Sequence, residues 1–295
     1  AEKFRQHLQN TTVFDLIEQD RALYSVSSTT TVEETLQILA QNKVTSVPVA
    51  NFEKGCTNFV DVLDILTFLR SLCKDVNSLV NMKVESFTEK PVGEIANLSN
   101  KDPFVSVKGT DSALCILDLF ASGVHRAAVN NDNGELVNVV SQFDFIRFVA
   151  KHLDLLPELS KQSIKDAGLG QSWVLHVRKT ERAISCFAKM VENGMNATGI
   201  VDLEGKLYGQ LSSTSLRGLT AETFKSLRLP VEEFLNIQNE PLRKSAVCVS
   251  EQSFEDVVNR LIAESTHRLW IENAAGFPAG VISLTDICLA LKNKQ

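Results

Sequence analysis

The sequence predicts an α/β fold built from four β-α-β-β-α repeats, and two observations carry this prediction. The first is a fixed spacing. His125 and Asp144 lie 19 positions apart, and His267 and Asp286 are separated by the same interval 142 positions later. The second is one order of apolar patterns in four successive stretches of the chain. A pattern that returns at a fixed period indicates duplicated structural units.

The same interval identifies two weaker copies of the repeat. Thr45 and Asp64 are 19 positions apart in the first repeat, and Asn196 and Ser215 are 19 positions apart in the third. All four repeats therefore keep one internal spacing, although their sequences have diverged.

Each repeat opens with a short segment in which polar and apolar residues alternate, as they do in a half-buried strand. These segments are 23–26, 104–107, 174–177 and 246–249. A helix is expected next, because apolar residues then recur at spacings of three and four, such as Val32, Leu36 and Leu39 in the first repeat.

Two short apolar strands follow this helix, joined by a turn of Asn and Gly residues such as 131–134 or 273–276. A second helix closes each repeat. The closing helices are predicted over 65–72, 145–151, 216–220 and 287–291. The amphipathic segment 4–17 is expected to be a further helix that packs on the first repeats, and a partner-binding helix is the alternative.

A repeat of about sixty residues with three short strands cannot bury a sufficient core alone, so the repeats are expected to pair. They span 11–72, 89–152, 172–221 and 229–292. The first two would form a module over 1–152, and the last two a module over 172–295. The stretch 154–171 between them contains Pro157, Gly168 and Gly170 among many polar residues, which is typical of a linker.

The composition argues against several classes of partner. The chain has 44% hydrophobic and 22% charged residues, as a folded globular protein does, and its net charge is −6. Nucleic acids and anionic membranes favour large basic patches, so neither is expected as a partner. The six cysteines are scattered without metal-ligand spacing, which predicts no metal site and favours a reducing compartment, the cytoplasm or alternatively the nucleus.

The apolar strands, the Gly-x-hydrophobic-Ser strand end and the Asp three residues later resemble the CBS domain. Four such repeats resemble the paired CBS (Bateman) modules of the nucleotide-sensing gamma subunit of AMP-activated protein kinase and its plant and yeast relatives. The likeness is strongest in the fourth repeat, over 256–262, 266–271 and 281–287. The resemblance implies two modules that form a flattened disc, and a non-catalytic subunit that binds AMP, ADP or ATP without a covalent cofactor. It also implies protein kinase catalytic and scaffold subunits as partners, with a homodimer as a further alternative.

The Ser-x-x-Asp turns admit two interpretations. Ser141 with Asp144, and Ser283 with Asp286, fit reciprocal caps at the start of a helix. A carboxylate at a strand-to-helix turn can also accept hydrogen bonds from both hydroxyls of a ribose. Because the turn recurs at a fixed distance from a cation, which a cap does not require, the recurrence shifts the balance toward the ribose interpretation for Asp144 and Asp286. Asp64 is included among the predicted nucleotide contacts, although its repeat lacks the cation.

The two basic pairs, His125-Arg126 and His267-Arg268, supply the positive charge that would bind the phosphate of the ligand. Cations just after a helix end can simply complement the helix dipole. Two pairs in equivalent places, however, would come together if the modules stack face to face, and Arg would then grip phosphate through its planar fork. In the family the matching residues contact ligand phosphate, and the resemblance implies the same role here.

Some positions depart from this pattern. The first repeat has Thr45 and Ser46 in place of the basic pair, and the third has Ser215 in place of Asp, so the third cleft is expected to be weak or empty. Thr30 matches a polar ligand-contacting position of the family and could equally be an N-cap. Thr285, inside the fourth turn, completes the predicted nucleotide contacts.

No motif typical of an enzyme accompanies these turns, so no catalysis is expected. Trp173, Trp270 and the sixteen Phe are expected in the core, with the alternative that Phe143 and Phe145, which flank Asp144, line a cleft. Two alternatives to a kinase subunit stay open. One is a separate adenosyl-ligand sensor that regulates another enzyme or a transporter, and the other is a scaffold whose clefts have decayed.

Overall fold

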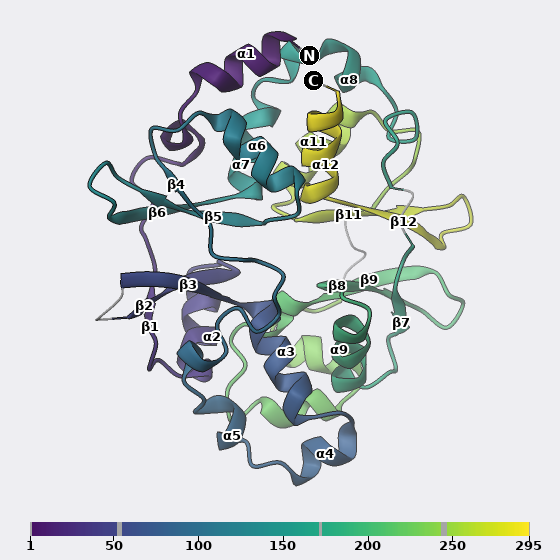
Figure 1. Ribbon diagram of the computed structural model, residues 1–295. Helices are drawn as coiled ribbons and strands as arrows, with labels where there is room; N and C mark the ends of the chain where they lie inside the picture. Colours follow the sequence, from purple (N-terminus) through teal and green to yellow (C-terminus); the bar gives the residue numbers. More distant parts are fainter. Residues whose placement is uncertain (1, 52–54, 171–172, 243–246, 295) are drawn as a thin grey trace. The chain divides into compact units, whose positions relative to one another are not determined.

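The computed structural model describes residues 2–51, 55–170, 173–242 and 247–294, and the chain divides into two compact units (Figure 1). Unit 1 comprises Ala1–Leu23, Phe104–Trp173 and Ala246–Gln295, and unit 2 comprises Tyr24–Pro103 and Val174–Ser245. Unit 1 therefore holds the second and fourth repeats, and unit 2 holds the first and third.

Four three-stranded sheets, one for each repeat, are present in the described ranges of the chain. The first repeat consists of β1 (Val26–Ser27), α2 (Val32–Gln41), β2 (Ser46–Asn51), β3 (Gly55–Asp61) and α3 (Val62–Leu72). The second consists of β4 (Ser106–Lys108), α6 (Ala113–Ala121), β5 (Arg126–Asn130), β6 (Leu136–Ser141) and α7 (Gln142–Ala150). The third consists of β7 (His176–Arg178), α9 (Ala183–Glu192), β8 (Ala197–Val201), β9 (Leu207–Ser212) and the 3-10 helix η4 (Ser213–Leu216). The fourth consists of β10 (Val247–Cys248), α11 (Phe254–Ala263), β11 (Arg268–Glu272), β12 (Pro278–Ser283) and α12 (Leu284–Asn293).

Shorter elements lie outside the repeats. They are α1 (Glu2–Asn10), η1 (Val13–Leu16), α4 (Val76–Asn81), α5 (Glu85–Thr88), η2 (Val92–Glu94), η3 (Leu153–Leu155), α8 (Pro157–Lys161), η5 (Phe224–Arg228) and α10 (Val231–Ile237).

The sheets share one topology. In each, the first strand pairs in parallel with the second, and the second pairs antiparallel with the third. Each hairpin also has a register shift at the equivalent place, such as Val129/Asn130 in the second repeat and Ile271/Glu272 in the fourth. A β-bulge kept at one position in four hairpins is the structural trace of duplication and confirms the predicted repeats.

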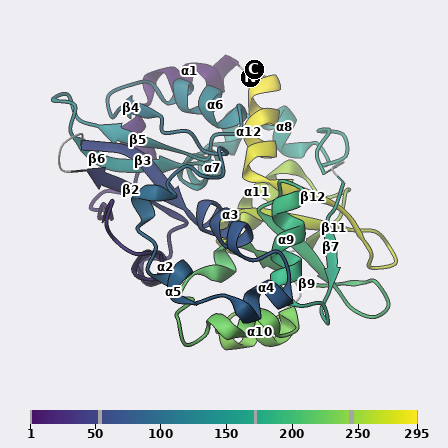
Figure 2. The same ribbon diagram turned by 60° about the horizontal axis from the view of Figure 1, so that its bottom comes forward.

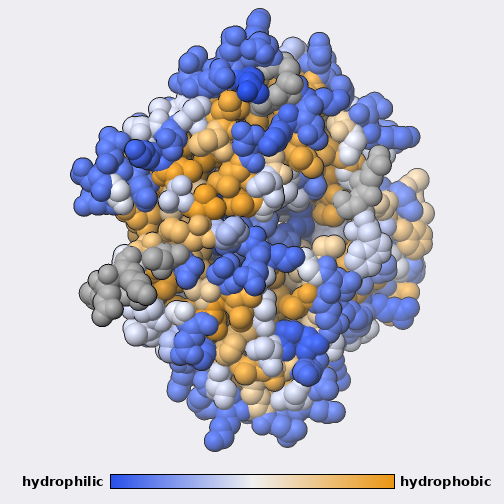
Figure 3. Space-filling view, in the orientation of Figure 1, coloured by the Kyte–Doolittle hydropathy of each residue, from blue (hydrophilic) through white to orange (hydrophobic). Residues whose placement is uncertain are grey.

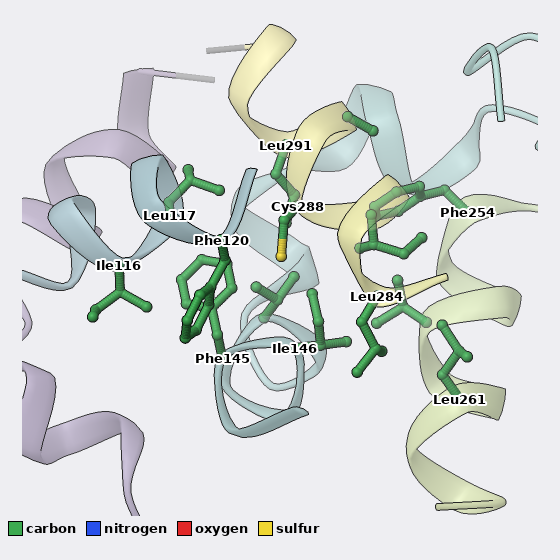
Figure 4. Close-up of a cluster of buried hydrophobic side chains, with 14 of the residues drawn as sticks. Ile116, Leu117, Phe120, Phe145, Ile146, Phe254, Leu261, Leu284, Cys288 and Leu291 are labelled. Atoms are coloured by element: carbon green, nitrogen blue, oxygen red, sulfur yellow. The ribbon is translucent and has the colours of Figure 1, made fainter. Parts of the chain in front are cut away.

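Unit 1 is held together by α6, α7, α11 and α12, which lie side by side against the two sheets (Figure 1). Their inward faces carry Phe120, Phe145 and Cys288, which point into one cluster with Leu261 at its side (Figure 4). The rings of Phe120 and Phe145 meet edge to face with centroids 6.3 Å apart. Burial of each such side chain stabilises the folded state by about 1.5–3 kcal/mol relative to leaving it exposed. Because the two repeats of unit 1 contribute these side chains to one cluster, they share a single core.

Unit 2 packs the first repeat on the third in the same manner, with α3 against α9 (Figure 2). Phe87 lies between Phe68 and Phe224, with ring centroids 5.9 and 5.3 Å away, and Phe187 meets Phe234 at 5.6 Å. Both units therefore bury an aromatic core between alternate repeats. The expected modules of consecutive repeats, 1–152 and 172–295, and the disc they would form stay predictions.

The N-terminal segment packs on the second repeat, as predicted. Phe4 and Leu8 of α1 are fully buried against α6, while the surface around α1 is hydrophilic (Figure 3). The helix is shorter than expected. It ends at Asn10, and Val13–Leu16 forms a separate 3-10 helix that begins after Thr12.

The closing helices differ from their predicted bounds in a regular way. Those of the first, second and fourth repeats begin three residues earlier than expected, directly after Asp61, Ser141 and Ser283, because the capping residue starts the helix rather than the first apolar residue. The predicted helix 216–220 is wrong. The third repeat has only η4, since serines fill its first turn and Gly218, with a φ of 78°, follows it.

The opening strands are confirmed, although they lie up to three residues later than predicted. Position 246, at the start of the fourth predicted strand, lies outside the described residues, as do 171 and 172. The stretch 154–171 is packed rather than extended as far as Gly170, because it forms part of η3 and all of α8 and buries Leu159 and Ile164 in unit 1. Trp270 is buried as expected, but the prediction that Trp173 lies in the core is wrong, because it is 63% exposed. Phe145 is fully buried in the core of unit 1, so the alternative that it lines a cleft is also wrong.

Candidate functional site

The corner of each repeat, where the third strand passes into the closing helix, lies beside the start of the second strand. In the second repeat Arg126 is the register partner of Ser141 across the hairpin. The backbone N–H of Gln142 donates to the carbonyl of His125 at 2.9 Å. The hairpin thus brings the basic pair next to the turn that carries Asp144.

The fourth repeat reproduces this arrangement. Arg268 pairs with Ser283 in the strand register, and the N–H of Leu284 donates to the carbonyl of His267 at 3.2 Å. The 19-residue interval in the sequence is therefore the length of one hairpin and its turn.

The Ser-x-x-Asp turns are reciprocal helix caps, so the capping interpretation is confirmed. Asp144 Oδ2 accepts from the N–H and the hydroxyl of Ser141 at 2.9 and 2.8 Å, and the hydroxyl accepts from the N–H of Asp144 at 3.2 Å. Asp286 and Ser283 do the same at 2.7, 2.7 and 3.3 Å. In both turns the cap uses Oδ2, and Oδ1 can take another partner.

Asp144 and Asp286 differ in the hydrogen-bond partners of Oδ1. Asp286 is half-buried, and its Oδ1 accepts no hydrogen bond from the part of the chain that the structure describes. A carboxylate oxygen that is fixed in direction by a cap and lacks an internal partner is suited to accept from a ligand hydroxyl.

Asp144 is closed by two guanidinium groups. Its Oδ1 lies 2.6 Å from Nη1 of Arg21 and 2.8 Å from Nη2 of Arg147, and its side chain is 1% exposed. Arg21 is fixed further by Asn138 and by the carbonyl of Val139. The carboxylate predicted to bind ribose is thus neutralised and screened from solvent.

Asp64 in the first repeat is also fully engaged. Its Oδ2 accepts from the N–H groups of Asp61 and Asn97 at 3.1 and 3.2 Å, and its Oδ1 accepts from the N–H of Ser99 at 2.9 Å. The carboxylate is 2% exposed. It holds the backbone that leads from the first repeat to the second.

The third repeat has a weaker corner. Ser215 is 3% exposed, and its hydroxyl receives only a long 3.5 Å hydrogen bond from the N–H of Ser212 within the described chain. The carboxamide of Gln238 donates to the carbonyls of Ser215 and Arg217 at 3.2 and 3.4 Å. That the third cleft is weak or empty stays a prediction.

The cations of the two basic pairs lie in different environments. Arg126 is buried and His125 is half-buried, whereas His267 is exposed and Arg268 is half-buried. Burial lowers the pKa of Arg268 to about 10, which still leaves the guanidinium protonated at neutral pH. The ring of Phe143, from the second repeat, lies 5.9 Å from that of His267.

The corners of the second and fourth repeats meet inside unit 1. The carboxamide of Gln142 donates to the hydroxyl of Thr285 at 2.9 Å, and that hydroxyl is 3.3 Å from Oε1 of Gln142. Gln142 also donates to the carbonyls of Phe120 and Val124, which fixes its position. The corners of the second and fourth repeats therefore contact each other through Gln142 and Thr285, and Thr285 is engaged by a neighbouring repeat. That the two basic pairs form one shared positive centre stays a prediction.

Thr30 is half-buried and is not the N-cap of α2. Its hydroxyl accepts from the N–H of Ser27 at 3.1 Å, and the cap is Thr31, which forms a capping box with Glu34. The alternative of an N-cap at Thr30 is therefore wrong, and its role as a ligand contact stays a prediction.

Five residues at the corners were missed in the sequence: Arg21, Asn97, Ser99, Gln142 and Arg147. Gln142 lies inside the Ser-x-x-Asp turn and Arg147 three residues after it, so both could have been found there. The other three belong to connecting segments before the first strand of a repeat, so no periodic signal marks them.

The described ranges contain no group of three or more His, Cys, Asp or Glu residues that could hold a metal ion. Within the same ranges, no helix has both the length and the apolar character needed to cross a bilayer.

The CBS domain family model matches residues 13–71 and 92–151, which are the first and second repeats. Protein SDS23 of Saccharomyces cerevisiae is 25% identical over 297 residues, covering 90% of this chain and 56% of the yeast protein. The chain thus spans just over half the length of the curated relatives it matches.

Two solved structures resemble the whole chain. Protein MJ1225 from Methanocaldococcus jannaschii, described as a candidate archaeal homologue of g-AMPK, matches with a TM-score of 0.74 and 21% identity, over 97% of this chain and 100% of that one. An uncharacterised conserved protein from Pyrococcus horikoshii matches with a TM-score of 0.57 and 17% identity, over 95% and 100%. Together with the CBS family match over 13–71 and 92–151, the first of these structures shows the predicted mixed α/β fold of CBS-domain repeats.

Proposed function

We propose that this chain of CBS-domain repeats is a non-catalytic regulatory protein that binds an adenine nucleotide, AMP, ADP or ATP, at the corner of its fourth repeat. Asp286 accepts hydrogen bonds from the ribose hydroxyls, and Arg268 holds the phosphate, with His267 beside it. The observation that carries the proposal is Oδ1 of Asp286, which accepts no hydrogen bond from the described chain. The turn that holds this oxygen begins at Ser283, the strand partner of the half-buried Arg268.

The chemistry of this corner favours a ligand with separated hydroxyl and phosphate groups. A carboxylate repels phosphate and attracts vicinal hydroxyls, while a guanidinium does the opposite. Because Arg268 is half-buried, its interaction with phosphate is screened less than at an open surface. Ser283 orients the carboxylate through the cap, and Thr285 can contribute its hydroxyl once it exchanges the bond to Gln142.

The other predicted contacts are secondary sites in this proposal. The corner of the second repeat, with His125, Arg126, Ser141 and Asp144, has the same residue types, but its carboxylate is occupied. In the first repeat, the Asp64 carboxylate accepts three backbone hydrogen bonds and has no basic pair beside it, while Thr30 lies in another segment, before α2. We therefore expect the fourth-repeat corner to bind most tightly.

The regulated partner is a separate question. The resemblance of the fourth repeat favours protein kinase catalytic and scaffold subunits, whereas the curated relatives carry the name SDS23, which leaves another enzyme or a transporter as the second candidate. In either case, occupancy changes partner activity only through differential affinity of the nucleotide for two arrangements of the chain. Recovery of kinase subunits with the tagged chain supports the first candidate, and their absence from such a preparation overturns it.

Isothermal calorimetry with AMP, ADP and ATP tests the binding site. Asp286→Ala removes one charge-assisted acceptor, worth about 1.5–3 kcal/mol, so affinity is expected to fall about tenfold to a hundredfold. Arg268→Gln is expected to weaken binding similarly by removing the phosphate contact.

Asp256→Ala is the matched control for this experiment. Asp256 is also the third residue of a Ser-capped helix in the fourth repeat, with Ser253 Oγ 2.7 Å from its carboxylate, but it is exposed and lies at α11 rather than at the corner. It should leave affinity unchanged. Equal affinities in wild type, Asp286→Ala and Arg268→Gln would overturn the site, and no binding of any nucleotide by the wild type would favour a scaffold.

A further inference from the structure

The segment just before the chain first leaves unit 1 is attached to the corner of the second repeat. Unit 1 passes into unit 2 between Leu23 and Tyr24. Two residues before that point, Arg21 donates to Oδ1 of Asp144 at 2.6 Å and to the carbonyl of Val139. The connection between the units therefore begins at the carboxylate predicted to bind ribose.

A second contact holds the same segment. Glu18 pairs with Arg147, whose guanidinium also reaches Oδ1 of Asp144 at 2.8 Å. Residues 18–21, which we call the latch segment, are thus linked to the corner at both ends. Within the segment Asp20 has a φ of 64°, a left-handed conformation that turns the chain between the two contacts.

The corner of the first repeat shows the same relation in unit 2. Asn97 and Ser99 donate their backbone N–H groups to Asp64 at 3.2 and 2.9 Å. They lie shortly before the chain returns to unit 1 between Pro103 and Phe104. Two independent connections are therefore fastened to the equivalent carboxylates of two repeats.

The fourth repeat is different. The chain also contacts the fourth repeat before it passes from unit 1 into unit 2. The carbonyl oxygen of Gly170 lies so close to Gly280 that a Cβ added to Gly280 would be 2.0 Å from this oxygen. This contact is with the strand and not with Asp286, whose Oδ1 receives no donor from the described residues. The corner that is not latched is the one with an available carboxylate.

We propose that Arg21 is a gating residue that keeps nucleotide out of the second-repeat corner, and that a ligand binds Asp144 only when the latch segment is released. This inference rests on the proposed function. The oxygen that would accept from a ribose hydroxyl already accepts two charge-assisted hydrogen bonds, and its side chain is 1% exposed. A ligand must replace the contact to Arg21 before it can reach that oxygen.

The latch gives occupancy of this corner a structural consequence. The ligand and Arg21 compete for the carboxylate of Asp144. The factor by which the attached latch segment lowers ligand affinity is therefore also the factor by which bound ligand weakens the attachment of the latch segment. The segment affected is the one that joins unit 1 to unit 2. The second-repeat corner would thus report high nucleotide concentrations, after the fourth-repeat corner has filled.

The test uses the full chain with Asp286→Ala, which removes the open corner, and measures AMP binding by calorimetry before and after adding Arg21→Ala. Asp286→Ala alone is expected to bind AMP weakly, and the double variant at least about tenfold more tightly, because the latch is gone. Arg21→Gln in the same background is a second variant that removes the charge but keeps a polar side chain. Fluorescence of buried Trp270 checks that unit 1 is folded in each protein.

Arg260→Ala is the matched control for the latch variant. Arg260, like Arg21, belongs to unit 1 and bonds one carboxylate and one backbone carbonyl, those of Glu264 and Val247. In the Asp286→Ala background it should leave AMP affinity unchanged.

Two outcomes overturn the gate and can be told apart. If wild type binds AMP but neither Arg21 variant gains affinity over Asp286→Ala, the gate is wrong and the proposed function stands. If wild type binds neither AMP nor ATP, the proposed function fails and the gate with it. Hydrogen exchange gives a further readout: saturating AMP should speed exchange of residues 18–23 in Asp286→Ala, and unchanged or slower exchange contradicts the competition.

Discussion

Asp144 and Asp286 occupy identical positions in their repeats, yet the structure predicts that their replacement by alanine has very different effects on stability. Each substitution removes half of a capping box, which costs about 0.5–2 kcal/mol. For Asp286, half-buried and without an internal partner on Oδ1 in the described chain, that is the whole expected cost.

Asp144→Ala also removes the carboxylate partner of Arg21 and leaves Arg147 with the exposed Glu18 as its partner. Removing one partner of a buried ion pair costs about 3–5 kcal/mol. The side chains of Arg21 and Arg147 are 28% and 23% exposed, so water compensates part of this loss, and the lower end, about 3 kcal/mol, is the appropriate figure.

Urea denaturation followed by tryptophan fluorescence measures the difference. The chain has two tryptophans, both in unit 1, and Trp270 is 2% exposed whereas Trp173 is 63% exposed. The signal therefore reports chiefly the unfolding of unit 1, where both aspartates lie. The cap costs about 1 kcal/mol in both variants, and the lost ion pairs add about 3 kcal/mol for Asp144→Ala. With a slope of about 2 kcal/mol per molar urea, Asp144→Ala should lower the midpoint by about 2 M and Asp286→Ala by about 0.5 M. Equal shifts, or a larger shift for Asp286→Ala, would refute the assignment of a closed and an open corner.

Three further outcomes are expected. Since burial lowers the pKa of Arg268 to about 10, AMP affinity of the wild type should fall as the pH rises from about 8 through about 10 and the cation is lost, and a parallel fall in Arg268→Gln would contradict this. Cys115 and half-buried Cys56 should react with a thiol reagent first, while the four buried thiols, whose pKa values burial raises, react only on unfolding; more than two reactive thiols in the native chain would be inconsistent. Gly280→Ala should destabilise unit 1 by about 1–3 kcal/mol, because its Cβ would lie 2.0 Å from the carbonyl of Gly170, and an unchanged urea midpoint would disprove that contact.

The repeat architecture could be predicted because duplication leaves a spacing in the sequence. The interval between His125 and Asp144 is set by a hairpin and one helical turn, and any chain that keeps that geometry keeps the number. The closing helices of the first, second and fourth repeats were predicted three residues late, since apolar periodicity begins after the capping turn and does not include it. The missing closing helix of the third repeat has a local cause in Gly218, which the apolar pattern alone did not weigh.

Which corner is open could not be predicted from the motif. Asp144 and Asp286 end the same Ser-x-x-Asp pattern, and the difference between them comes largely from Arg21, which lies 123 positions before Asp144. Arg147 adds a second donor where the fourth repeat has Leu289, and that local difference was visible in the sequence. Likewise, the distant donors to Asp64 are the backbone N–H groups of Asn97 and Ser99, which any residue type except proline could supply. Contacts that depend on long-range placement, or on the backbone alone, leave no mark in a repeat pattern.

The prediction that both tryptophans are buried is wrong for Trp173. Trp270 lies inside a strand between register partners and is buried, while Trp173 follows a connecting segment and has 63% of its surface exposed. Hydrophobicity predicts burial only for a residue whose element packs on one side against a core.

The most direct measurement is a crystal structure of the chain with AMP bound. It should show the ribose hydroxyls within hydrogen-bonding distance of Asp286 Oδ1 and the phosphate at the Arg268 guanidinium, with Arg21 still on Asp144. Density for AMP elsewhere, with Asp286 facing only solvent, would contradict the nucleotide site at the fourth repeat.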